Sequence, residues 1–197
     1  MKELILGGVR SGKSSLAERH ARESGLEVVY IATAHAPDDP ELQQRIDRHR
    51  RRRPAEWLTV EEPYQLAAAL RLNAAVGRCL LVDCLTLWLS NLLCADAAPP
   101  AARDASRVTA TDASQRTAAG ISRLAAERAA LLDTFPRLPG HIILVGSETG
   151  LGVVPLGELT RRFVDGAGDL HQELARLCDR VIFTVAGLPQ ILKGIQP

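Results

Sequence analysis

The chain has 197 residues, of which 46% are hydrophobic and 24% are charged, and its net charge is +1. This length is sufficient for one domain with a full hydrophobic core, residues 1–197, and leaves little room for a second. The balanced charge gives no general attraction to nucleic acid, and no apolar stretch approaches the ~18 residues that a membrane span requires.

Apolar, β-branched runs alternate with segments of helical periodicity along the chain. The runs predict strands at residues 3–7, 27–33, 57–60, 78–83, 141–146 and 180–186. The periodic segments predict helices at residues 13–24, 38–50, 63–72, 84–94, 114–134 and 156–178. Residues 95–113 are expected to form a loose connection. Because several strands are apolar on both faces, this order predicts an α/β fold with a mainly parallel sheet and helices on both faces.

The four cysteines and the N-terminus indicate where the protein works. The cysteines show no CxxC spacing, which favours reduced and mostly buried thiols. The first apolar run is too short for the core of a signal peptide, and no small-residue cleavage site follows it. We therefore expect a cytoplasmic location.

The strongest motif lies between the first predicted strand and the first predicted helix. It fits the pattern GxxxxGK[ST] and consists of Gly7, Gly8, Val9, Arg10, Ser11, Gly12, Lys13 and Ser14. Glycines allow successive backbone amides to point at phosphate oxygens, and the helix N-terminus adds partial positive charge. Lys13 can reach the terminal phosphates, and the Ser14 hydroxyl can bind Mg²⁺. The motif predicts a P-loop that binds GTP or ATP.

A P-loop needs an acidic residue near the magnesium ion, at the end of a neighbouring strand. Asp83, which ends the apolar run at 78–83, is the best candidate. The alternative is that Asp83 caps the N-terminus of the helix predicted at 84–94, and the two roles are compatible.

A basic run with one histidine is the second unusual feature. It consists of Arg48, His49, Arg50, Arg51, Arg52 and Arg53. It can be a solvated helix end, or a nucleic-acid patch, although the balanced charge and the lack of interleaved aromatic residues speak against the patch. It can also hold a triphosphate through its arginines, with or without His49 as a nucleophile at the α-phosphorus. The run alone leaves these alternatives open.

Longer segments of the sequence resemble one enzyme family. These are GGVRSGKSSLAE, VVYIATA, RIDRHRRRRPAEW, LLVDCLTLWLSNLL, ETGLGVVP, LTRRFVDGAGDLHQELA and VIFTVAGLPQILK, which together span nearly the whole chain. The chain is similar to the bifunctional adenosylcobinamide kinase / adenosylcobinamide-phosphate guanylyltransferases of cobalamin biosynthesis. The string at 45–57 and the ETGxGxVP segment are far more specific than the P-loop.

The resemblance implies a RecA-like P-loop domain, a homotrimer and two activities. First, a nucleoside triphosphate, ATP or GTP, phosphorylates the aminopropanol hydroxyl of adenosylcobinamide. Second, GMP from GTP is transferred to adenosylcobinamide phosphate through a guanylyl-histidine, with release of pyrophosphate. The position that matches the family's histidine is His49, and Mg²⁺ is expected at Ser14 and Asp83.

The resemblance also assigns nucleotide contacts beyond the P-loop. They map onto Ala32, Thr33, Ala34, Arg50, Arg51, Arg52, Arg53, Glu61 and Asp83. Many members carry Glu at the position of Asp83, and often Asn at the positions of Ser147 and His171. These changes remove no charged group, so we expect both activities.

One P-loop must serve chemistry at both the γ- and the α-phosphorus, so we expect residues 35–56 to move on nucleotide binding. Glu148, in the glycine-rich segment after the strand at 141–146, is a candidate contact to the corrinoid or the phosphates. Two rival interpretations remain: a P-loop kinase of another metabolite, in which His49 is incidental, and a nucleotide-dependent switch with negligible turnover.

Overall fold

Seven strands form one sheet in the part of the chain that the computed structural model describes, residues 1–35, 43–44, 46–47, 50, 53–97 and 122–194. The strands are β1 (Lys2–Gly7), β2 (Glu27–Ala32), β3 (Leu58–Glu61), β4 (Arg78–Asp83), β5 (His141–Ser147), β6 (Arg180–Val185) and β7 (Leu188–Lys193). Their order is β3-β2-β4-β5-β1-β6-β7, and every pair is parallel except β6 with β7. The predicted mainly parallel sheet is confirmed.

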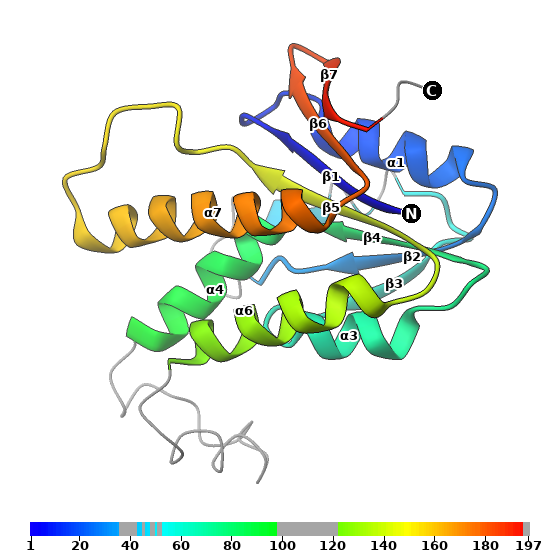
Figure 1. The fold of residues 1–197 in the computed structure, drawn as a ribbon, viewed down its shortest axis with the longest axis horizontal. Helices are drawn as coiled ribbons and strands as arrows, with labels where there is room; N and C mark the ends of the chain where they lie inside the picture. Colours follow the sequence, from blue (N-terminus) through cyan, green and yellow to red (C-terminus); the bar gives the residue numbers. More distant parts are fainter. Residues whose placement is uncertain (36–42, 45, 48–49, 51–52, 98–121, 195–197) are drawn as a thin grey trace, which may run out of the picture.

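Helices cover both faces of this sheet (Figure 1). They are α1 (Lys13–Glu23), α3 (Leu66–Asn73), α4 (Leu85–Ala97), α6 (Arg123–Thr134) and α7 (Glu158–Leu177), with a short 3-10 helix, η3 (Phe135–Arg137), after α6. α1 lies on one face, and α3, α4, α6 and α7 lie on the other. None of these helices, the longest in the described part included, could cross a membrane.

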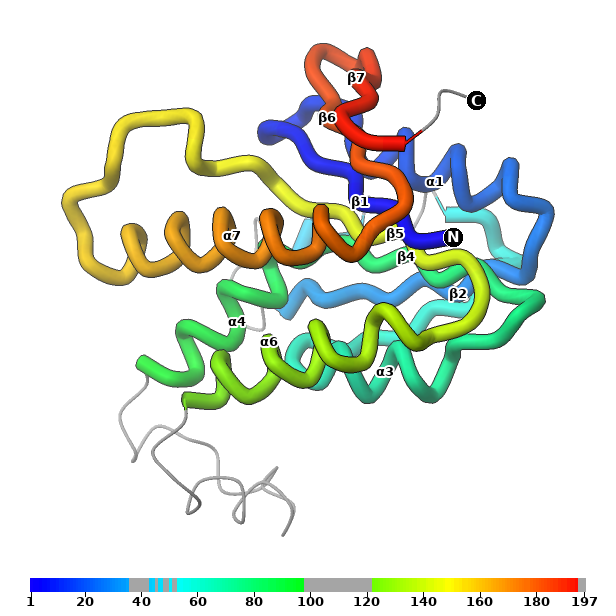
Figure 2. Tube along the Cα trace, in the orientation of Figure 1, coloured from blue at the N-terminus to red at the C-terminus, as the bar shows by residue number. Residues whose placement is uncertain are grey.

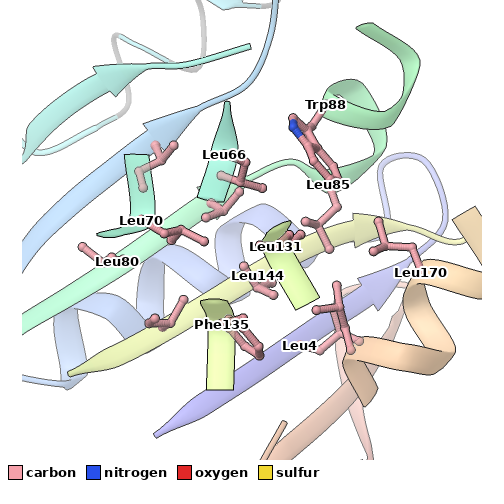
Figure 3. Close-up of a cluster of buried hydrophobic side chains, with 14 of the residues drawn as sticks. Leu4, Leu66, Leu70, Leu80, Leu85, Trp88, Leu131, Phe135, Leu144 and Leu170 are labelled. Carbon is pink, nitrogen blue, oxygen red and sulfur yellow. The ribbon is translucent and has the colours of Figure 1, made fainter. Parts of the chain in front are cut away.

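Alternating side chains of the strands form two apolar layers. Leu4 packs into the larger layer with Leu144 and Trp88 beneath α3, α4, α6 and α7, as Figure 3 shows. Ile5, the next residue of β1, packs with Leu16 in the smaller layer under α1. This alternation is the period of two that a strand buried on both faces requires. Both tryptophans, Trp57 and Trp88, are buried in these layers.

The register of the sheet gathers the ends of the parallel strands at one edge. Ala32, at the end of β2, is paired with both Glu61 of β3 and Asp83 of β4. Gly7, at the end of β1, is paired with Ser147 of β5. Asp83 was expected on a strand beside the P-loop strand, but β5 lies between β4 and β1. The site at this edge therefore spans several strands, which is where open α/β sheets bind ligands.

Several helix boundaries differ from the prediction. The helix predicted from residue 63 begins at Leu66, because the Glu62 carboxylate accepts the amide protons of Tyr64 and Gln65 and forms a turn before it. α4 continues to Ala97, so residues 95–97 are helical rather than part of the connection.

The helix predicted at 114–134 begins at Arg123, after Ser122 caps it by accepting the Ala125 amide proton, and residues 114–121 lie outside the described ones. In the helix predicted at 38–50, residues 43, 44, 46, 47 and 50 are helical and the others are outside the description. Residues 98–113 are also outside it.

The strand predicted at 180–186 is not the last one. β6 ends at Val185, and the chain turns through Ala186 and Gly187, with φ of 52° and 80°, into the antiparallel β7. Two consecutive residues with positive φ are typical of the tight turns that match the twist of a hairpin. Figure 2 shows this hairpin above α1, next to the turn that joins β1 to α1.

The cysteines behave as expected. All four are free, and Cys79, Cys84 and Cys178 are buried whereas Cys94 is exposed. Burial raises the pKa of the Cys79 thiol to about 11 and that of Cys178 to about 12. These buried thiols are therefore protonated and unreactive at neutral pH.

Candidate active site

The P-loop runs from the end of β1 to the first turn of α1. A Cβ on Gly7 would lie 2.5 Å from both the Ser11 hydroxyl and the Thr184 carbonyl oxygen, so only glycine fits there. Gly12 caps α1 with a φ of 96° and offers no side-chain acceptor to the helix. The first amides of α1 are therefore available to an anion, and the helix dipole favours one there.

A cavity of about 460 Å³ opens beside this loop. Its walls come from the P-loop, from the ends of β2, β3, β4 and β5, from the first turn of α4 and from the basic segment. They are Arg10, Ser11, Gly12, Lys13, Ser14, Ser15, Tyr30, Ala32, Ala34, Ile46, Arg50, Arg53, Glu61, Asp83, Cys84, Thr86, Leu87 and Ser147. The Lys13 ammonium donates to the Gly8 carbonyl at 3.1 Å, so this charge lies over the loop.

Most of the predicted nucleotide contacts meet in this cavity, and some do not. Gly7, Gly8, Val9 and Thr33 are not among its walls. Val9 is exposed, whereas Thr33 is fully buried. His49, Arg51 and Arg52 lie outside the residues that the structure describes. The structure therefore places the described arginines of the basic segment, Arg50 and Arg53, at the cavity with the P-loop.

Asp83 is held by a neighbour on β2. The Tyr30 hydroxyl donates to Asp83 Oδ2 at 2.8 Å. Burial, and then the negative charge of Asp83, raise the pKa of Tyr30 well above its ordinary value of 10.0, so the phenol stays a donor at neutral pH. α4 begins two residues after Asp83. The Asp83 carboxylate is thus turned to Tyr30 and the cavity.

Thr33 forms hydrogen bonds to the backbone that follows Asp83. Its hydroxyl accepts the Cys84 amide proton at 2.9 Å and donates to the Cys84 carbonyl at 2.7 Å. The Asn91 side chain donates to the Thr33 carbonyl at 2.7 Å. These bonds tie the end of β4 and the start of α4 to the end of β2, and so fix the backbone that carries Asp83.

The two described arginines have different partners. The Arg50 guanidinium is hydrogen bonded to the Glu61 carboxylate, and Asp47 lies 3.9 Å away. The Arg53 guanidinium carbon lies 3.6 Å from the centroid of the Tyr30 ring. Such cation–π contacts hold a guanidinium in place without consuming all of its donors. Both side chains can therefore present N–H groups to phosphate oxygens.

The oxygen donors of the cavity suit Mg²⁺. Ser14 and Asp83 both line it, and Mg²⁺ is usually bound by one or two such groups together with substrate phosphates and water. Within residues 1–35, 53–97 and 122–194 and the isolated described positions between them, no group of three or more His, Cys, Asp or Glu side chains could hold a metal. The donor set fits a metal that arrives with a nucleotide rather than one held in a cage of side chains.

Sequence reasoning did not assign seven residues of the cavity wall, namely Ser15, Tyr30, Ile46, Cys84, Thr86, Leu87 and Ser147. The period of a strand could have revealed Tyr30, because it lies two residues before Ala32 and on the same face of β2. No comparable sequence pattern indicates Thr86. Its hydroxyl oxygen accepts the Ser147 amide proton at 2.6 Å, a contact between residues 61 apart in the chain.

Glu148, in the loop after β5, is not among the walls of this cavity. The Glu148 carboxylate accepts the Gly150 amide proton at 2.6 Å and lies 4.0 Å from His171 Nδ1. Burial lowers the pKa of His171. The loop that follows exposes apolar side chains, namely Leu151, Val153, Val154 and Leu156.

A second cavity, of about 490 Å³, lies at the opposite ends of the strands. Its walls include the buried Glu3, whose carboxylate is 3.0 Å from His20 Nδ1, 3.3 Å from Arg180 Nη1 and 3.7 Å from His141 Nε2. Both histidines thus lie beside a buried carboxylate and have a structural role there.

Comparisons with known proteins cover nearly the whole chain. A family model described as cobinamide kinase / cobinamide phosphate guanyltransferase matches residues 3–192. The bifunctional adenosylcobalamin biosynthesis protein CobP of Pseudomonas aeruginosa is 59% identical over 194 residues, 98% of each chain. The bifunctional adenosylcobalamin biosynthesis protein CobU of Escherichia coli is 34% identical over 191 residues, 95% of this chain and 97% of that protein.

Solved structures are less similar. The RadB recombinase shares 16% identity with a TM-score of 0.44, over 92% of this chain and 73% of that one. The flagellar accessory protein FlaH of Methanocaldococcus jannaschii shares 16% identity with a TM-score of 0.43, over 98% of this chain and 78% of that one.

Proposed function

Because the chain belongs to the cobinamide kinase / cobinamide phosphate guanyltransferase family, we propose that it carries out both reactions of that name at the P-loop edge of its sheet. It phosphorylates adenosylcobinamide and then transfers GMP from GTP to the phosphorylated product. The observation that carries the proposal is the single cavity in which Lys13 and Ser14 meet Asp83 and the arginines of the basic segment.

In the first reaction, the aminopropanol hydroxyl oxygen attacks the γ-phosphorus of ATP or GTP. The bond from that phosphorus to the β–γ bridging oxygen breaks, the nucleoside diphosphate leaves, and the hydroxyl proton passes to solvent. The P-loop amides and Lys13 hold the β- and γ-phosphates and offset the charge that moves to the leaving oxygen. Mg²⁺, held by Ser14 and Asp83, would neutralise phosphate charge. Ala32 and Ala34 contribute small walls at the end of β2, where the nucleotide approaches the backbone.

In the second reaction, a neutral imidazole nitrogen of His49 attacks the α-phosphorus of GTP and expels pyrophosphate. The phosphate of adenosylcobinamide phosphate then attacks the guanylyl-histidine, and the imidazole leaves. Arg50, the residue after His49 in the sequence, lines the cavity and supports this assignment. The arginines of the segment, including Arg51 and Arg52, offset the charge of the pentacoordinate phosphorus.

The test is to incubate the purified protein with adenosylcobinamide and Mg²⁺, with ATP or GTP, and to separate the corrinoid products. We expect adenosylcobinamide phosphate to form with ATP or GTP as the phosphate donor. Adenosylcobinamide-GDP should form only when GTP is present. Lys13→Ala should slow both reactions, and His49→Ala should form adenosylcobinamide phosphate but no adenosylcobinamide-GDP. If only another small metabolite is phosphorylated, the protein is a kinase of different specificity. Tight nucleotide binding without any product would make it a switch.

We further propose that the enzyme works in the cytoplasm as a homotrimer. The similarity of the chain to the bifunctional relatives over at least 95% of its length supports an assembly like the one implied by the family resemblance. Light scattering of the purified protein, with an expected mass of three times 21.3 kDa, tests this.

A further inference from the structure

Tyr30 lies between two charged residues of the cavity. It is 1% exposed, and β2 carries it on the same face as Ala32. Its hydroxyl donates to Asp83 Oδ2 at 2.8 Å, and the face of its ring lies 3.6 Å from the Arg53 guanidinium carbon. One buried side chain therefore contacts both the acidic and the basic groups that face the nucleotide.

The two contacts use different parts of the side chain. The hydroxyl bond restricts rotation of the Asp83 carboxylate, because one of its oxygens is tied to a buried and immobile donor. The ring contact matters for Arg53 because, among the described residues, no group accepts a hydrogen bond from the buried Arg53 Nε. The ring face therefore supports that guanidinium, and a phenylalanine could supply the same contact.

We propose that Tyr30 is a positioning residue that aims Asp83 at the metal–nucleotide complex through its hydroxyl and holds Arg53 at the phosphates through its ring. This role rests on the proposed function, because it presumes a nucleotide and Mg²⁺ in the cavity. It extends that function by dividing the support of the site into two separable parts, one polar and one aromatic.

The division predicts different defects in two variants. Tyr30→Phe keeps the ring against Arg53 and removes the donor to Asp83. It should therefore weaken metal binding and leave nucleotide binding in the absence of metal unchanged. Tyr30→Leu removes both contacts, so it should weaken the binding of the metal and also the binding of the nucleotide. Tyr64→Phe is a matched control. The Tyr64 ring also contacts an arginine, since the Arg123 guanidinium carbon lies 4.4 Å from its centroid, but Tyr64 does not line the cavity.

The experiment measures Mn²⁺ binding to the complex of protein and a non-hydrolysable GTP analogue, by the electron paramagnetic resonance signal of free Mn²⁺. Tyr30→Phe should raise the dissociation constant about tenfold, as loss of an outer-shell partner of a metal ligand does. In kinase assays the same variant should need more Mg²⁺ for half-maximal rate, with kcat restored at saturating Mg²⁺. Tyr64→Phe should match the wild type in both measurements.

The second arm measures affinity for a fluorescent GTP analogue in EDTA. Tyr30→Leu should bind the analogue severalfold more weakly than Tyr30→Phe does. Arg53→Gln should show the same loss of affinity, and it replaces Tyr30→Leu in the test if that variant does not fold. Unchanged Mn²⁺ affinity in Tyr30→Phe, or unchanged metal-free affinity in Arg53→Gln, would overturn the proposal. These outcomes differ from failure of the proposed function, in which the wild-type protein itself would bind no guanine nucleotide in the cavity.

Discussion

The amide of Gly187 donates a hydrogen bond of 2.8 Å to the carbonyl of Ser11, which joins the turn of the β6–β7 hairpin to the P-loop. At the same place a Cβ on Gly12 would lie 3.1 Å from the Gly187 Cα atom. The hairpin therefore packs on the loop that is proposed to hold the phosphates, and a side chain at Gly12 would press against it.

Gly12→Ala should damage the P-loop more than its small size suggests. The residue has a φ of 96°, where a non-glycine residue costs about 1–3 kcal/mol, and the new methyl group meets the hairpin. We expect GTP affinity to fall roughly tenfold or more, since about 1.4 kcal/mol corresponds to a factor of ten. Isothermal titration calorimetry measures this.

The matched control is Gly77→Ala, because a Cβ at Gly77 meets nothing within 4 Å and the residue is remote from the loop. It should bind GTP as the wild type does. Equal affinities for Gly12→Ala and Gly77→Ala would show that the hairpin does not constrain the loop.

Thr33→Val should destabilise the protein and impair catalysis together. The substitution keeps the shape of the side chain but leaves the buried Cys84 amide without the hydroxyl that accepts its proton. Such a loss costs about 1–3 kcal/mol. The backbone that carries Asp83 should also become less ordered, so the kinase rate should fall.

Thr33→Ser retains the hydroxyl and is the natural rescue variant. Urea unfolding and kinase assays on both variants check the prediction. If Thr33→Ser is as defective as Thr33→Val, then packing of the methyl group, rather than the hydroxyl, maintains this turn.

Arg50→Ala should affect function but hardly affect stability. The ion pair with Glu61 joins side chains that are 45% and 59% exposed, and such surface pairs contribute about 0–1 kcal/mol. Loss of a guanidinium that lines the proposed nucleotide cavity should nevertheless slow guanylyl transfer. Arg19→Ala is the control, since Arg19 also pairs with an exposed glutamate, Glu23, but on the far part of α1. A similar transfer rate in the two variants would remove Arg50 from the site.

Glu3 should contribute to stability in a pH-dependent manner. Burial alone would raise the pKa of this carboxyl, but the adjacent His141 and His20 outweigh it and lower the pKa to about 2, from 4.5 when unfolded. Its stabilising contribution is therefore complete above pH 4.5 and disappears as the pH falls towards about 2. The shift corresponds to roughly 3 kcal/mol at most.

Glu3→Gln should thus be less stable at neutral pH and should lose less stability than the wild type between pH 4.5 and 2. Thermal unfolding across this range measures both effects. Glu23→Gln, at an exposed position of the same cavity, should retain the wild-type acid profile. Parallel acid profiles for Glu3→Gln and the wild type would contradict the assignment.

The sequence predicts the buried strands of this fold better than the ends of its helices. The strand at 78–83 is predicted to the residue, because its apolar run is buried on both faces and needs no partner from elsewhere to be recognised. The end of α4 is missed because its last turn depends on a tertiary contact. The Asp96 carboxylate there accepts the amide protons of Arg123 and Leu124 at the start of α6.

β7 is missed for a local reason. It contains Pro189, which weakens the pattern of a strand, and it is an edge strand with mostly exposed side chains. In the site, the P-loop and Asp83 follow from motif and strand period. The strand period could also have placed Tyr30 at the cavity, but it does not reveal the bond to Asp83, and no local pattern reveals Thr86. These bonds join residues 53 and 61 positions apart. Motifs report local chemistry, whereas these contacts arise from the register of the sheet.

We propose that His49, which precedes Arg50 in the sequence, accepts the nucleotidyl half of the GTP bound at the P-loop. The most direct test is to incubate the protein with GTP labelled at the α-phosphorus and Mg²⁺, denature it, and measure label on the chain. We expect acid-labile label in the wild type, its absence in His49→Ala, and kinase activity in both. A wild-type chain that carries no label, or a His49→Ala chain that carries as much as the wild type, would contradict the account.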